Sequence, residues 1–143
     1  MEKGLMEEKM TDLNNYFKTH SDIATVYLFG SYGTSLYDSE LSDIDLAIIL
    51  SRKLSLKEEM LIDAEISLIL ESDNFDVIIL NKARIDICYQ VLGTGTIIYE
   101  RDNILTAEFV EKTLKHYFDH GIALEKMKED TIAALKEDSI PRD

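Results

Sequence analysis

Apolar residues recur along the first half of the chain at spacings that alternate between helix and strand. Met6, Met10, Leu13 and Phe17 are spaced by four, three and four residues, which predicts an amphipathic helix over about residues 4–19. Runs rich in β-branched and aromatic residues at 23–29 and 43–50 predict two strands. Ser55 and Glu58 have the spacing of a capping box. They predict the start of a helix that continues through the following apolar residues, Met60, Leu61, Ala64 and Leu68.

The second half continues the alternation of strands and helices. The sequence predicts a strand at 75–80, a short helix at 83–92 closed by Gly93, and a strand at 96–99. Apolar residues at mostly helical spacings then predict a long C-terminal helix over about 104–136, with Gly121 as a point where it can break. This order favours one α/β (α+β) domain over residues 1–143, with a small mixed sheet and flanking helices.

Composition fits a small globular protein. The 143 residues are 45% hydrophobic and 30% charged, which is enough for one core. The one cysteine, Cys88, allows no disulfide framework, and its apolar neighbours predict a packed thiol rather than a nucleophile. No run approaches the length of a membrane span, and the start of the chain does not resemble a secretory signal. We therefore expect a cytoplasmic protein without membrane contact.

The charge balance narrows the choice of partners. The chain has 28 acidic against 15 basic residues, a formal net charge of −13. Nucleic-acid binding is driven by Lys and Arg that displace counterions, so we expect no direct nucleic-acid contact by this domain alone. Complementary charge instead favours a basic protein partner, although an acidic surface also serves solubility alone.

The most informative segment follows the first predicted strand. Gly30 and Ser31 come directly after Phe29, and Asp43 and Asp45 follow a spacer of eleven residues. Alternation in a strand puts both aspartates on one face, where they repel each other unless a cation lies between them. Mg²⁺ prefers one or two carboxylates with water and phosphate oxygens, and a Gly-Ser turn offers a backbone N–H and a hydroxyl to a phosphate. Either piece alone also fits an ordinary turn or a charged edge strand, but together they indicate a metal–nucleotide site.

This combination resembles the nucleotidyltransferase superfamily, in which a strand, Gly-Ser, about ten residues and Asp-x-Asp follow one another. The chain is most similar to the minimal nucleotidyltransferases, the MNT antitoxins paired with HEPN ribonuclease toxins. The resemblance covers about residues 23–100, and the spacer is at most one residue longer than usual. It implies a polymerase-beta-like fold. It also implies a third carboxylate from a later strand, for which Asp76 is placed suitably.

The resemblance implies a function as well. An Mg²⁺-dependent enzyme of this kind, with two metal ions, transfers AMP from ATP to a tyrosine hydroxyl of its HEPN toxin and so neutralises it. Gly30 and Ser31 would hold the nucleotide, Asp43 and Asp45 the metal, and Asp76 would complete the second metal site or take the hydroxyl proton. A hetero-oligomer with the toxin is expected. Two alternatives stay open: an antitoxin that acts by binding alone, and a small-molecule nucleotidyltransferase of the aminoglycoside type.

Several other features carry less information. His116 and His120 have metal-ligand spacing but no third ligand, which favours a solvated or packed pair. Tyr32 and Tyr37 lie in the motif loop, where they either stack on a base or are ordinary loop residues. The cations closest to the predicted strand ends are candidates for triphosphate contacts: Arg52, Lys53, Lys82 and Arg84.

Overall fold

The computed structural model describes residues 2–29 and 44–139, and the side chains of residues 7–29, 44–120 and 126–135. The elements follow in the order α1 (Glu2–Thr19), β1 (Ile23–Phe29), β2 (Ile44–Leu50), α2 (Leu56–Leu70), β3 (Phe75–Ile79), a 3₁₀ turn η1 (Leu80–Lys82), α3 (Ile85–Thr94), β4 (Thr96–Glu100), α4 (Asn103–His116), a π-helical turn η2 (Tyr117–Gly121) and α5 (Ile122–Ser139). The predicted alternation of helices and strands is therefore confirmed for the described part of the chain.

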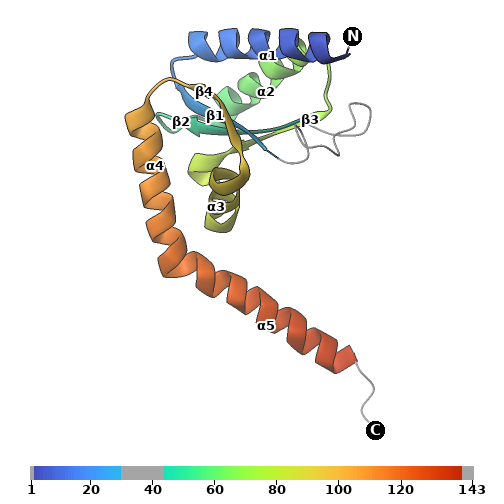
Figure 1. The fold of residues 1–143 in the computed structure, drawn as a ribbon, viewed down its shortest axis with the longest axis vertical. Coiled ribbons are helices and arrows are strands. Elements are labelled where there is room, and N and C mark those ends of the chain that lie inside the picture. Colours follow the sequence, from blue (N-terminus) through green and yellow to red (C-terminus); the bar gives the residue numbers. More distant parts are fainter. Residues whose placement is uncertain (1, 30–43, 140–143) are drawn as a thin grey trace.

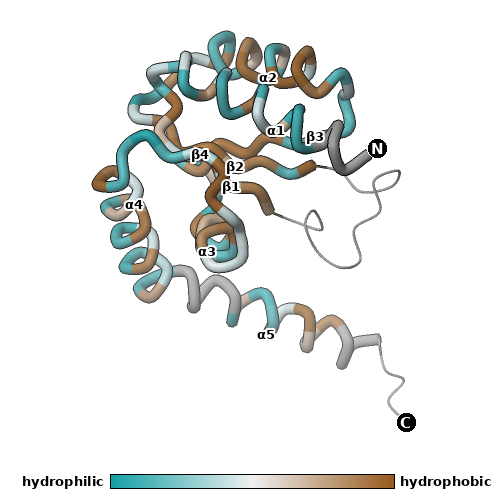
Figure 2. Tube along the Cα trace, turned by 45° about the horizontal axis from the view of Figure 1, so that its top comes forward, coloured by the Kyte–Doolittle hydropathy of each residue, from teal (hydrophilic) through white to brown (hydrophobic). Residues whose placement is uncertain are grey.

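The strands form one mixed sheet in the order β3-β2-β1-β4. β2 and β3 are parallel, with α2 as the connection between them, whereas β1 is antiparallel to both β2 and β4. Helices α1 and α2 cover one face of the sheet, and α3 and α4 lie on the other (Figure 1). The hydrophobic colouring of Figure 2 is concentrated in the strands between these helix layers.

The α1–α2 side holds the larger core. Leu13 and Phe17 of the predicted amphipathic helix are fully buried, together with Ile62 and Ile66 of α2. The capping box at the start of α2 is present, since Ser55 and Glu58 exchange their side-chain to backbone hydrogen bonds. The apolar residues that mark α2 in the sequence nevertheless lie on its outer surface. The most exposed of them are Met60, Leu61 and Leu68.

The α3–α4 side has a smaller core around Ala47, Ile49, Cys88 and Val91. Cys88 is 4% exposed, and burial raises the pKa of its thiol, which confirms a packed cysteine. Its Sγ donates to the carbonyl oxygen of Leu80 at 3.3 Å.

The end of α3 differs from the prediction. Gly93 does not close the helix, which continues to Thr94. Gly95 is the C-cap, and its N–H donates to the carbonyl oxygen of Val91 at 2.7 Å. A Cβ at Gly95 would lie 2.7 Å from that same oxygen, so the close approach, not the first glycine in the sequence, decides where the helix ends.

The long C-terminal helix is divided in two. Its predicted break at Gly121 is confirmed, because the π-helical turn η2 ends there and separates α4 from α5. The ring of Tyr117 in this turn stacks on Tyr89 of α3, with centroids 3.7 Å apart and planes at 3°. Beyond the turn, α5 leaves α4 and extends past α3 (Figure 1). Among the described residues, none of the helices is long and apolar enough to cross a membrane.

Candidate nucleotide and metal site

Two of the predicted carboxylates come together on one face of the sheet. Asp45 on β2 is the register partner of Asp76 on β3 in the parallel pair. Parallel neighbours in register point to the same face, with strands about 4.8 Å apart. The alternation along β2 places Asp45 on the face of Ala47 and Ile49, which is the α3–α4 side. Two segments 31 residues apart in sequence thus present adjacent carboxylates.

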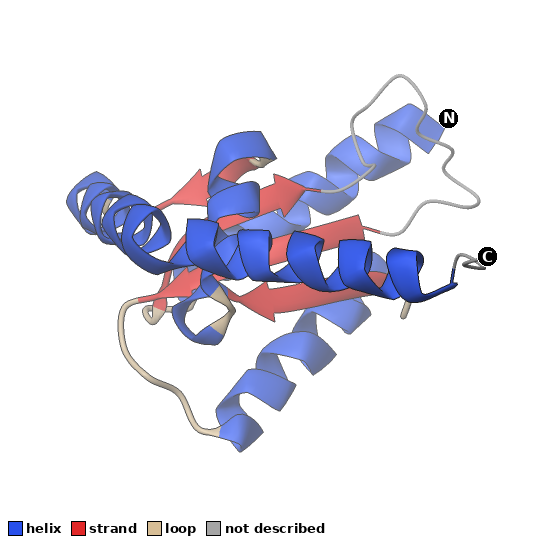
Figure 3. Ribbon diagram, turned by 90° about the horizontal axis from the view of Figure 1, so that it is seen from below, coloured by secondary structure: helices blue, strands red, loops and turns tan. Residues whose placement is uncertain are grey.

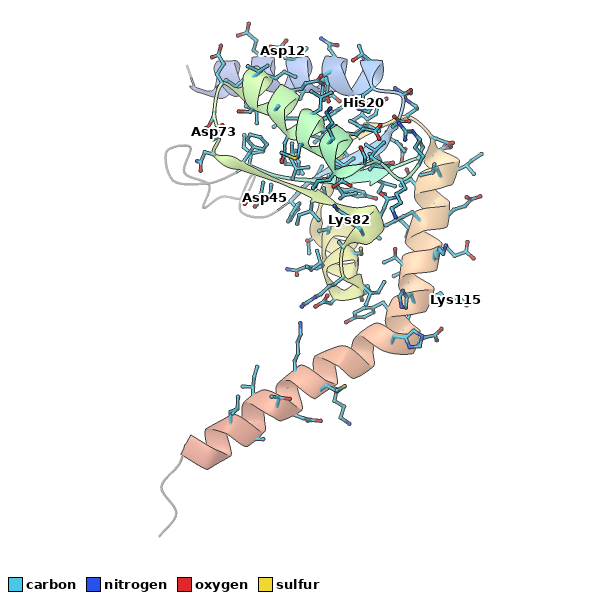
Figure 4. All side chains as sticks on the ribbon, turned by 180° about the vertical axis from the view of Figure 1, so that it is seen from behind. Asp12, His20, Asp45, Asp73, Lys82 and Lys115 are labelled. Atoms are coloured by element: carbon cyan, nitrogen blue, oxygen red, sulfur yellow. The ribbon has the colours of Figure 1, made fainter. Side chains whose placement is uncertain are left out.

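The pair lies at the end of the sheet where β2 and β3 begin and β1 ends. Phe29, the last residue of β1, is the antiparallel partner of Asp45. Figure 4 shows Asp45 and Asp73 toward this same end. Gly30, Ser31 and Asp43 lie outside the described residues, as do Tyr32 and Tyr37. Phe29, the last described residue before the motif segment, ends β1, and Ile44, the first one after it, begins β2. Both lie next to the Asp45–Asp76 pair.

Negative charge accumulates around Asp76. Burial raises the pKa of the Asp63 carboxyl, and the charges of Asp76 and Glu59 raise it further. An open pocket of about 430 Å³ borders Asp76 on the α2 side of β3, away from the face that Asp45 and Asp76 share, and its lining includes Asp63, Ser67 and Asp73. Asp63 is not among the residues predicted from the sequence, where its only signal is a polar position beside the buried Ile62 in the helix that connects β2 and β3. A cation would relieve this repulsion.

Three of the four basic residues considered for triphosphate contacts, Arg52, Lys82 and Arg84, form ion pairs within the domain. Arg52 binds Asp22 and Glu58, and its NH2 group lies 2.7 Å from the Glu58 carboxylate. Lys82 binds Glu59, and Figure 4 shows Lys82 at the opposite end of β3 from Asp45. Arg84 binds Asp86 at 2.6 Å. These four ion pairs lie at the starts of α2 and α3 rather than at the Asp45–Asp76 end of the sheet.

The donor set fits Mg²⁺ better than a softer metal. Two adjacent carboxylates supply the number of protein ligands that Mg²⁺ usually takes, and phosphate oxygens and water complete its shell. Within residues 7–29, 44–120 and 126–135, no group of three or more His, Cys, Asp or Glu side chains forms a complete metal cage. The His116 and His120 rings stand edge to face, 5.2 Å between centroids, and both residues are exposed, as expected of a solvated pair.

Comparison with known proteins relates this arrangement to a family. The sequence model of the family described as polymerase beta, nucleotidyltransferase matches residues 11–104. This range includes strands β1, β2 and β3 and the register pair Asp45–Asp76. No curated protein is significantly similar to the chain in sequence.

Solved structures show the same fold over nearly the whole chain. The structure of the toxin–antitoxin MntA-HepT matches with a TM-score of 0.67 and 20% identity, covering 87% of this chain and 97% of that one. A toxin–antitoxin structure with AMP-PNP matches with a TM-score of 0.69 and 23% identity over 88% and 98% of the two chains. A tri-AMPylated Shewanella oneidensis HEPN toxin in complex with MNT antitoxin gives 0.67 and 21% over 87% and 96%. The structural similarity covers more of the chain than residues 11–104, the range matched by the family model.

Proposed function

Because the chain belongs to the polymerase beta nucleotidyltransferase family, we propose that it transfers AMP from ATP to a tyrosine hydroxyl of a HEPN-family toxin and thereby neutralises it. The observation that carries the proposal is the register pair Asp45–Asp76 on the α3–α4 side of the sheet. The structural relatives support the choice of acceptor, because they are toxin–antitoxin complexes and one of them holds an AMPylated toxin.

The chain's own residues divide the work of this reaction. Asp45 and Asp76 would hold Mg²⁺ together with Asp43, while Gly30 and Ser31 would bind the phosphates through a backbone N–H and a hydroxyl. Bound Mg²⁺ neutralises phosphate charge and stabilises the charge that develops during transfer. The fixed spacing of Asp45 and Asp76 on adjacent strands orients what binds between them, which is the main requirement of phosphoryl-type transfer.

The bonds that form and break are defined by the substrates. The tyrosine oxygen attacks the α-phosphorus of ATP, the bond to the bridging oxygen of pyrophosphate breaks, and pyrophosphate leaves. The hydroxyl proton goes to solvent if Asp76 is a metal ligand, or to the Asp76 carboxylate if it is not; Asp76 is exposed at the start of β3, which is compatible with either role. The products are a tyrosine–AMP phosphodiester and pyrophosphate.

Mass spectrometry tests the proposal directly. A purified HEPN-family toxin is incubated with the chain, ATP and Mg²⁺, and we expect the toxin to gain one or more AMP masses. Asp76→Asn should abolish the gain, whereas Asp73→Asn, a nearby acid outside the register pair, should retain it. A stable complex of the chain and the toxin without any gain in mass would contradict the proposed AMP transfer and favour an antitoxin that acts by binding alone.

A further inference from the structure

Helix α5 exposes large apolar side chains. Met127 is 66% exposed, Ile132 is 53% and Leu135 is 63%. Every side chain described in α5, from residue 126 to residue 135, is exposed. Helices gain most of their stability in proteins by packing an apolar face. The apolar residues of α5 therefore form a surface that its own domain leaves uncovered.

The direction of this surface follows from an ion pair. Lys128 Nζ lies 3.1 Å from Asp86 Oδ2 on α3, so the Lys128 side of α5 is turned toward the domain. At about 100° per residue, Leu135 lies about 80°, Lys128 about 100° and Ile132 about 140° around the helix from Met127. The charged residue that contacts α3 thus lies within the apolar stripe. We call Met127, Ile132 and Leu135 the inner face of α5.

The inner face is on the catalytic side of the sheet. Asp86 belongs to α3, which packs on the same sheet face as Asp45 and Asp76. Figure 3, seen from below, shows α5 crossing under the sheet, and Figure 1 shows that it runs on the α3 side. It extends toward the end of the sheet at which Figure 4 places Asp45. A protein that approaches the carboxylate pair from this side meets α5.

A second apolar surface adjoins the first. A groove of about 560 Å³ between α3 and α4 is lined by the apolar or aromatic residues Tyr89, Leu92, Val110 and Leu114 and by Asp86, Gln90, Gly93 and Thr94. Through Asp86 the groove meets the point where α5 is held. Contiguous exposed apolar surface of this kind is typical of protein-binding sites.

We propose that the inner face of α5 and the α3–α4 groove together dock the protein acceptor of the adenylyl transfer. This inference rests on the proposed function. The occupant is a basic protein, because the chain carries a net charge of −13 and complementary charge directs the encounter. Apolar residues then supply the affinity, and the bound protein lies on the side of the sheet that carries the Asp45–Asp76 pair. A second copy of this acidic chain would be repelled instead.

Outward-facing residues on α2 provide a matched control. Leu61 is 59% exposed and Leu68 is 78% exposed, comparable to Met127 and Leu135, but α2 covers the other face of the sheet (Figure 1). Glutamate at either pair of positions adds the same charge to an exposed helix. The two double variants therefore differ in location and not in chemistry.

The test measures binding of the same HEPN-family toxin by calorimetry in the absence of ATP. The double variant Met127→Glu/Leu135→Glu should bind more weakly, with a dissociation constant raised at least about 30-fold, as expected when apolar anchors are lost. Leu61→Glu with Leu68→Glu should change it by less than about 3-fold. Circular dichroism verifies that both variants remain folded, and light scattering records their oligomeric state.

Each outcome distinguishes the two proposals. If the α5 variant binds as tightly as the wild type, or if the α2 variant alone loses binding, the docking surface is wrong and the proposed function stands. If the α5 substitutions dissociate a homodimer without affecting HEPN binding, the occupant is a second copy and the inference is overturned. If the wild type neither binds nor modifies the HEPN protein, both proposals fail.

Discussion

Substituting Asp76 by asparagine should stabilise the protein in the absence of metal. Asp45 and Asp76 are register partners on one face of the sheet, and Asp76 is exposed. Two unit charges about 5 Å apart in a water-like dielectric repel each other by about 1 kcal/mol. Asparagine keeps the size and removes this repulsion together with the unfavourable charge near Asp63. We therefore expect the melting temperature to rise by about 3 °C.

The sign of this effect should reverse when Mg²⁺ is added. A ligand that binds only the folded state stabilises it, by about 1.4 kcal/mol at ten times its Kd. The wild type should gain this stabilisation, and Asp76→Asn should lose most of it because one carboxylate ligand is gone. The variant should then be more stable than the wild type in EDTA and less stable than the wild type in Mg²⁺.

Differential scanning fluorimetry in EDTA and across a Mg²⁺ series measures both effects. Asp73→Asn is the control, since Asp73 accepts a hydrogen bond from Ser67 at 2.8 Å and has no role in the register pair. It should leave the response to Mg²⁺ unchanged. An Asp76→Asn variant that melts lower than the wild type in EDTA, with an undiminished response to Mg²⁺, would refute the assignment of Asp76 to the metal site.

Three further predictions concern stability. The pKa of Asp63 is raised in the folded state, so this group contributes stability at pH values below the ordinary aspartate pKa and loses that contribution as pH rises through the raised pKa. Asp63→Asn should therefore raise the melting temperature at neutral pH but not at pH values below the ordinary aspartate pKa. A gain in melting temperature that is the same at every pH would be inconsistent with this cause. Thr25 and Thr106 share a buried hydrogen bond of 2.5 Å, and Thr106 also donates to a backbone carbonyl at 3.1 Å; in urea unfolding, Thr106→Val should cost about 1–3 kcal/mol, more than Thr25→Val, and equal costs would contradict this ordering. Phe17 is fully buried, so Phe17→Ala should cost about 3–5 kcal/mol in the same assay, and a loss below about 1 kcal/mol would show that the position is not part of the core.

The sequence predicted elements well where local chemistry decides them. Ser55 and Glu58 form the capping box because the interaction needs only residues within one helical turn. It predicted less well where packing decides. Leu61 and Leu68 marked the helix α2 in the sequence, yet they are exposed, whereas Ile62 and Ile66 are buried, because packing against the sheet determines which side of the helix is covered.

The candidate site was predictable in part for the same reason. Asp45 follows from a local motif, and Asp76 follows from the family resemblance, but their register is a property of the β2–β3 pairing. Asp63 had no comparable signal, because its contribution to the local charge depends on how α2 packs against the sheet. The roles of Gly30, Ser31 and Asp43 remain predictions from sequence, since these residues lie outside the described part of the structure.

The two exposed apolar surfaces of the molecule are not equivalent, and this bears on how acceptor binding and transfer are linked. The α2 residues lie on a helix fixed against the sheet by Ile62 and Ile66. By contrast, the Lys128–Asp86 contact that holds α5 includes a lysine whose side chain is 49% exposed, and exposed ion pairs contribute little stability. Under the docking proposal, a protein that buries the inner face of α5 would supply more binding energy than this ion pair and would thereby set the position of the helix. Correct placement of α5 would then depend on the acceptor, so that binding and alignment with the Asp45–Asp76 pair occur together.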